Sequence, residues 1–194
     1  LNDDFLGIHE ILNHLASLGH RRIAFLGGRM DHISNLNRYR AYKVLMDEIF
    51  GSWDPGLAVV EQSPASISGG CAQAELLLAR KIPFSAAVCV NDDIAIGAME
   101  VFRQNRLSIP GSVSVTGFHD MDLASQVEPP LTTIHISCEE LGRAAYQLIN
   151  IRRNSPTISH PLQIQVGTDL VIRESTAPAR TARCSSRRKK SAAR

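Results

Sequence analysis

Apolar residues along this chain form short runs that alternate with segments of helical spacing. Ile8, Ile11, Leu12 and Leu15 recur every three or four residues and predict a helix, which Gly19 can end in a left-handed conformation. Strands are predicted over 23–26, 57–60, 86–90 and 113–116, with helices over about 37–49, 69–80 and 92–105, the last capped by Asp92 or Asp93. This alternation predicts an α/β fold with a doubly wound parallel sheet.

The rhythm changes after Pro129-Pro130. Residues 131–136 read as extended, and residues 139–153 read as a helix. Its inward face is predicted to hold five apolar residues, namely Leu141, Ala144, Ala145, Leu148 and Ile149. Two short strands are predicted over 162–166 and 169–172.

Two of the predicted strands end on polar pairs, Asn91-Asp92 and His119-Asp120. In open α/β sheets, ligands bind at the carboxyl ends of the strands. The pattern therefore indicates a small-molecule receptor.

Composition narrows the class of protein. The chain has 194 residues, 44% hydrophobic and 21% charged, which is typical of a globular domain. No apolar stretch approaches the ~20 residues of a membrane span. Residues 1–15 carry three acidic residues and no cleavage site, so no signal peptide is expected and a cytoplasmic location is favoured.

The sequence contains no motif that is typical of a catalytic site. The four cysteines lack metal-ligand spacing, and there is no phosphate loop or nucleophile elbow, so we expect no enzyme, no cofactor and no metal site. The segment after Pro178 holds seven of the 21 basic residues and none of the 19 acidic ones, which leaves 14 basic residues and a net charge of −5 before it. Residues 179–194 are predicted to be a disordered basic tail.

Three segments carry a family resemblance: Leu18-Gly-His-Arg-Arg-Ile-Ala-Phe-Leu-Gly-Gly28, Val113-Ser-Val-Thr-Gly-Phe118 and Pro130-Leu-Thr-Thr-Ile134. They resemble the effector-binding domain of the lactose-repressor (LacI/GalR) family of bacterial transcription factors, with agreeing spacing over about 2–176. The resemblance implies a fold like the type I periplasmic binding proteins, with one subdomain complete and the other partly present.

The resemblance also implies a division of the chain. Residues 1–132 would form the C-terminal subdomain, 133–161 a crossover into a partial N-terminal subdomain, and 162–178 the return strands. The family's remaining N-terminal units and its DNA-reading headpiece have no counterpart here, so the chain reads as truncated at the N-terminus. The apolar stripe over 139–153 should then be exposed.

Site residues follow from the resemblance. Arg38 and Asn91 occupy positions that bind a sugar or related effector, and His32 and Ser34 would face the same cleft. His119 stands where the family usually has aspartate, which favours an acidic or phosphorylated ligand over a neutral sugar. Asp120 is expected to hold the loop by hydrogen bonds. Two positions that are often aromatic in the family hold Pro64 and Cys138.

Apolar residues cover more than one face of the helix over 92–105. The resemblance implies that Ile96 and Met99 lie in a homodimer interface. It further implies an effector-sensing domain that modulates operator binding allosterically, with DNA bound only through a headpiece outside this chain. Two alternatives stay open: a sugar-binding transport protein of the same fold, and a truncated remnant without function.

Overall fold

The computed structural model describes residues 1–60, 64–155 and 160–180. The prediction of a disordered basic tail over 179–194 falls almost entirely outside the described residues.

The centre of the fold is a parallel sheet with the strand order β2-β1-β3-β4. Its strands are β1 (Ile23–Leu26), β2 (Ala58–Val59), β3 (Ala86–Cys89) and β4 (Ser114–Thr116). Every residue of these strands is buried, as expected for a sheet that is covered on both faces.

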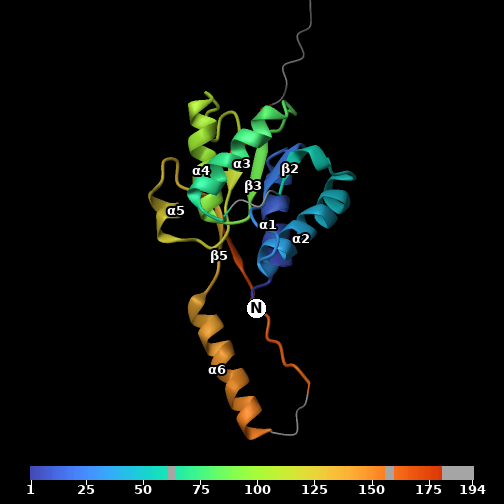
Figure 1. Ribbon diagram of the computed structural model, residues 1–194, viewed down its shortest axis with the longest axis vertical. Helices are drawn as coiled ribbons and strands as arrows, with labels where there is room; N and C mark the ends of the chain where they lie inside the picture. Colours follow the sequence, from blue (N-terminus) through green and yellow to red (C-terminus); the bar gives the residue numbers. More distant parts are fainter. Residues whose placement is uncertain (61–63, 156–159, 181–194) are drawn as a thin grey trace, which may run out of the picture.

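Two pairs of helices cover this sheet. The helices are α1 (Asp4–Ser17), α2 (Ile33–Phe50), α3 (Ile67–Ala79) and α4 (Asp92–Gln104). Figure 1 shows α1 and α2 on one side of the strands and α3 and α4 on the other. The predicted doubly wound α/β fold is thereby confirmed. We call this unit, with its sheet and four helices, the body.

Several predicted helix boundaries shift, and at α3 the earlier start follows a side-chain cap. Helix α2 begins at Ile33 instead of about residue 37, and α3 begins at Ile67, where the Ser66 hydroxyl accepts a bond from Gly69 N at 3.2 Å. The cap of α4 is Asn91, and the prediction of Asp92 or Asp93 was wrong. Gly19 has φ of +84°, so the left-handed end of α1 is confirmed.

Two short helices were not predicted. A 3₁₀ turn, η1 (Pro55–Leu57), includes Leu57 and shortens β2 to two residues. Helix α5 (Asp122–Gln126) follows the end of β4. Both lie in segments too short to show a helical spacing of apolar residues.

A second, antiparallel pair of strands follows: β5 (Thr133–His135) and β6 (Asp169–Val171). The predicted strand over 162–166 was wrong. The segment lies beside residues 1–3 and makes three backbone hydrogen bonds with them, but these form only the isolated bridge between Asn2 and Val166 and no strand. Between β5 and β6, the chain runs out through α6 (Cys138–Asn154) and returns. We call residues 136–168 the arm.

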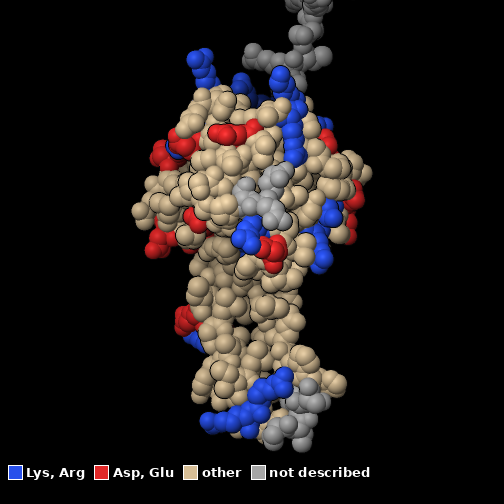
Figure 2. All heavy atoms as spheres, viewed as in Figure 1, with Lys and Arg blue, Asp and Glu red and all other residues tan. Residues whose placement is uncertain are grey.

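The arm has little core of its own. Ala144 is the only buried residue among the side chains of α6, whereas Tyr146 and Ile149 are 67% and 64% exposed. Figure 1 shows α6 extending away from both sheets. A groove of about 690 Å³ lies between α6 and the helices α1 and α2. Figure 2 shows few charged side chains on the narrow part of the molecule between the body and the far end of α6. The predicted exposure of the apolar stripe is confirmed at Ile149.

Candidate functional site

The candidate site lies at the carboxyl ends of β4 and β5. A cavity of about 810 Å³ opens there, next to the start of the arm. Its polar lining includes His119 and Asp120 after β4, and His135 at the end of β5. The cavity is thus at the sheet edge where strand-end polarity predicted a ligand site.

Arg38 of α2 lies directly behind this edge, with only 1% of its surface exposed. Its Nε donates to Asp4 Oδ1 at 2.8 Å, and its Nη1 donates to the carbonyl of Val90 at 2.7 Å. The guanidinium also stacks 3.7 Å from the centroid of the Phe118 ring. Burial lowers the pKa of Arg38, and the charge of Asp4 offsets part of that effect. The sequence placed Arg38 near the cleft, and its contact with a ligand stays a prediction.

His119 joins Arg38 to the cavity. Nη2 of Arg38 lies 3.2 Å from Nε2 of the imidazole. The backbone at His119 has φ of +116°, a conformation that side-chain-bearing residues rarely adopt, and its N–H donates to the Ile134 carbonyl at 2.8 Å. Burial, together with the charges of Arg38 and His32, lowers the pKa of His119 to about 4. The ring is therefore neutral at physiological pH.

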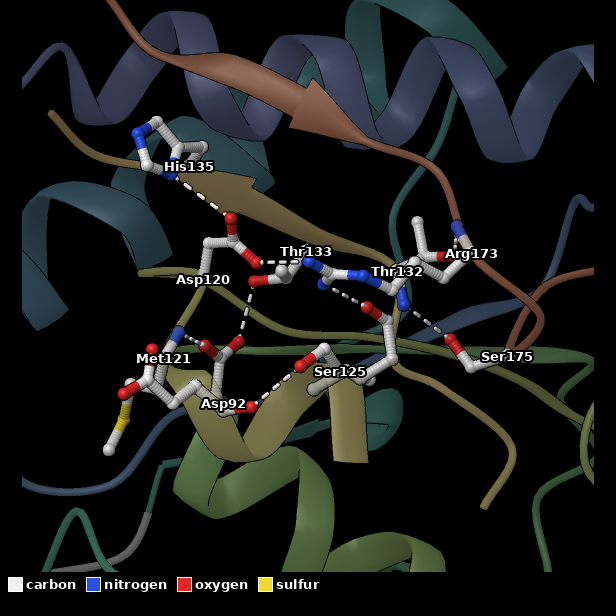
Figure 3. A network of polar contacts seen from close by, with 11 residues as sticks. Asp92, Asp120, Met121, Ser125, Thr132, Thr133, His135, Arg173 and Ser175 are labelled. Carbon is white, nitrogen blue, oxygen red and sulfur yellow. Dashed lines mark hydrogen bonds and ion pairs between the residues drawn. The ribbon is translucent and has the colours of Figure 1, made fainter. Parts of the chain in front are cut away.

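Asp92 is a buried anchor, which the sequence offered as a helix cap and as part of a polar strand end. Its carboxylate accepts from Thr133 Oγ1 at 2.5 Å and from Met121 N at 2.8 Å, as Figure 3 shows. Burial raises the pKa of Asp92 to about 6, and these hydrogen bonds limit the rise. Gly117 is required beside it, since a Cβ there would lie 2.2 Å from Oδ1. Asp92 thereby ties the start of α4 to β5 and to the loop before α5.

Asp120 links β4 to both strands of the second sheet. Its Oδ1 accepts from Arg173 Nη2 at 2.6 Å, and its Oδ2 lies 3.0 Å from His135 Nδ1 (Figure 3). Arg173 also donates to the Leu131 carbonyl at 2.8 Å. Asp120 holds the loop, in agreement with its expected structural role. Arg173 carried no sequence signal, because it lies far from Asp120 along the chain.

The other predicted contacts lie in different surroundings. Asn91 accepts from Ile94 N at 2.9 Å and donates to the Ala65 carbonyl at 3.3 Å, so its amide is used within the body. Ser34 lines the groove beside α6 and not the cavity with His119. His32 is exposed at the start of α2. The structure therefore brings Arg38 and His119 together, with His32 close enough for its charge to lower the pKa of His119, whereas Ser34 lines the groove beside α6.

Pro64 and Cys138 stand where aromatic residues were expected from the resemblance. Pro64 is exposed, and Cys138 lines the cavity that contains His119. On α4, Met99 is 1% exposed and packs in the core of the body, while Ile96 is half-buried. Met99 therefore has little surface left for a partner, and the homodimer interface stays a prediction.

Two searches of the described residues bear on function. No described helix is both long enough and apolar enough to cross a membrane. Within the same part of the chain, no three histidine, cysteine or acidic side chains are grouped so that they could hold a metal ion.

Comparison with known proteins matches the model of the periplasmic binding protein-like domain over residues 12–176. The chain belongs to this family, in the form found in LacI-type transcriptional regulators. The chain is 31% identical over 179 residues to the HTH-type transcriptional regulator DegA of Bacillus subtilis. The match covers 92% of this chain and 52% of that protein. It is 30% identical over 175 residues to the ribose operon repressor of Haemophilus influenzae, and this match covers 90% of this chain and 52% of that protein.

A similar solved structure is that of a LacI family transcriptional regulator from Enterococcus faecium with bound ribose. The TM-score is 0.76 at 26% identity, and the match covers 92% of this chain and 65% of that one. The chain spans about half the length of the curated relatives described above. These relatives are transcriptional regulators, and the fold and family predicted from the sequence are confirmed.

Proposed function

We propose that this chain senses a small-molecule effector, a sugar or a related compound, on behalf of a LacI-type transcriptional repressor. The observation that carries the proposal is the cavity at the carboxyl ends of β4 and β5, lined by His119, Asp120 and His135. It lies in the segment that matches the family model. The ribose bound in the related structure and the name of the ribose operon repressor support a sugar as the ligand class.

The mechanism we propose is a change in the angle between the body and the arm. The cavity is lined from both units, by His119 of the body and by Cys138 and Leu141 of the arm. A ligand that contacts both units favours one orientation, provided that it binds the two orientations unequally. Coupling of this kind typically amounts to ~1–3 kcal/mol.

The remaining partners belong to the same proposal. Operator DNA would be bound by a headpiece outside this chain, and two copies would act together, as suits a palindromic operator. Ile96 is half-buried on α4 and could contribute to the contact between the copies. Binding of the effector and of the operator DNA would take place in the cytoplasm, where the DNA is. No catalytic step is required of any residue.

The test is thermal unfolding of the chain with ribose and a panel of other pentoses and hexoses. A ligand that binds only the folded state raises the unfolding temperature by mass action. We expect a rise that is lost in His119→Ala and kept in His9→Ala, which changes a histidine of α1 outside the cavity. Absence of a rise with every sugar, from a chain that unfolds cooperatively, would contradict the proposal.

A further inference from the structure

The contact between Arg38 and His119 fixes which ring nitrogen of His119 carries the proton. A guanidinium group has five N–H donors and no acceptor. Because Arg38 Nη2 lies 3.2 Å from Nε2 of His119, Nε2 must offer a lone pair. A neutral imidazole has one protonated nitrogen, so the proton is on Nδ1.

The protonated nitrogen is free to act on a ligand. Among the described residues, none accepts a hydrogen bond from Nδ1 of His119, and Nδ1 is not among the buried polar atoms that lack a partner. Nδ1 is therefore accessible to solvent, and His119 is one of the residues that line the cavity. The Arg38 contact holds the ring at Nε2, and the bond from the backbone N–H of His119 to the Ile134 carbonyl holds the backbone that carries the ring.

We propose that His119 selects the effector by donating from Nδ1 to a carbonyl oxygen or to an unprotonated ring nitrogen. This inference rests on the proposed effector site and names the chemistry of its ligand. A carboxylate at the same place would only accept, and would select a hydroxyl donor instead. The N–H donor of a fixed imidazole ring instead favours a hydrogen-bond acceptor on the ligand.

The charges around the cavity favour an uncharged acceptor over an anion. Asp120 and Asp122 both line the cavity, and Asp92 lies buried close by. The two nearby arginines are already paired, Arg38 with Asp4 and Arg173 with Asp120. An incoming carboxylate or phosphate would meet no unpaired cation among these groups. The proposal therefore differs from the acidic or phosphorylated ligand that the sequence favoured.

The protonation state is tested first, by nitrogen NMR of the chain labelled with ¹⁵N-histidine. Long-range spectra distinguish a protonated ring nitrogen from a bare one, and His119→Gln assigns the signal. We expect a single neutral form with the proton on Nδ1 that persists from pH 7 to pH 5. A proton on Nε2, or a ring that titrates at the ordinary pKa of histidine, would overturn the inference.

The ligand class is tested by calorimetric binding of ribose, glucose and galactose, each compared with its lactone and its aldonate. The lactone replaces a hydroxyl by a carbonyl oxygen, and the aldonate adds a negative charge. We expect the native chain to bind one of the lactones most tightly. His119→Asp should weaken that lactone about tenfold or more, because two acceptors then face each other. His119→Asn, which keeps a donor at the same position, should retain the preference for the lactone.

The outcomes separate the two proposals. Tightest binding of a sugar or an aldonate by the native chain would overturn the inference about His119 and leave the effector site standing. Lack of binding by all nine compounds, from chains that unfold cooperatively, would overturn the proposed function together with the inference that rests on it.

Discussion

The body and the arm use the same apolar spacing with opposite results. In α1, the stripe that contains Ile11 is completely buried against the body. In α6, the stripe that contains Ile149 leaves that side chain 64% exposed. Identical patterns of sequence therefore end in different environments, and the difference lies in what each helix has to pack against.

The arm relies on local interactions instead. The Ser137 hydroxyl caps α6 by accepting from Glu140 N at 3.2 Å, and Arg143 pairs with Glu139 one turn away. Acidic residues occupy its first turn and basic residues its last, in agreement with the helix dipole. In proteins, most of the stability of a helix comes from tertiary packing of its apolar face, and α6 has only one buried residue. Long-range burial stabilises the body, and short-range contacts stabilise the arm.

The largest effect should come from Ile11→Ala. This change removes a fully buried side chain from the interior of the body. We expect the free energy of unfolding to fall by about 2–5 kcal/mol, from lost burial and the cavity that remains. Urea unfolding followed by circular dichroism measures it. A loss below about 1 kcal/mol would show that α1 is not part of the cooperative core.

The next effect should come from Asp4→Asn, which leaves the buried charge of Arg38 without its carboxylate. Removal of one partner of a buried ion pair costs about 3–5 kcal/mol, and here solvent near Asp4 should bring the loss toward the lower value. The same urea titration measures it. Asp47→Asn, which removes an exposed charge on α2, is the control and should stay within about 0.5 kcal/mol of the parent chain.

A smaller effect is expected in the pH dependence of stability. The folded state keeps His119 neutral down to about pH 4, whereas the unfolded chain binds a proton near pH 6.5. The contribution of this group is therefore fully present above pH 6.5 and is lost as the pH falls toward 4. The difference in unfolding free energy between the parent and His119→Gln should shrink over that window. Asp92 titrates in both chains, so its opposite effect cancels; a constant difference would contradict the assignment.

The smallest effect should come from Ile149→Ala, the counterpart of Ile11→Ala in the arm. The side chain is mostly exposed, and alanine favours the helix slightly more than isoleucine does. We expect a change of less than about 0.5 kcal/mol in the free energy of unfolding. A loss as large as that of Ile11→Ala would mean that the arm is covered in solution, and the contrast with the body would fail.

The sequence predicted the body well because its elements repeat a strong pattern. Strand β1 was predicted to the residue, since four consecutive apolar residues between polar and glycine positions read only one way. The segment 162–166 alternates apolar and polar residues as a strand does, yet it pairs with residues 1–3 only through the bridge between Asn2 and Val166. Strand propensity is thus decided by pairing, which a single sequence does not show.

The site was harder to predict than the fold. Polar strand ends located it, and His119 was recognised as unusual for its position. The partners of these residues come from distant segments: Asp4 lies in α1, Thr133 in β5, and Arg173 after β6. Such contacts decide which polar atoms remain free for a ligand. They explain why Asn91, a good candidate from its place alone, is used as a helix cap.

The register of the second sheet shows that the pairing of β5 and β6 does not depend on the arm. His135 and Asp169 are Cα partners in the antiparallel pair β5–β6, although the whole arm separates them along the chain. The two strands are thus paired as in a β-hairpin, with α6 and its return in place of a short turn. Hairpins are commonly closed by two to five residues. A gene that encodes a tight turn in place of residues 136–168 would therefore leave the pairing of both strands intact.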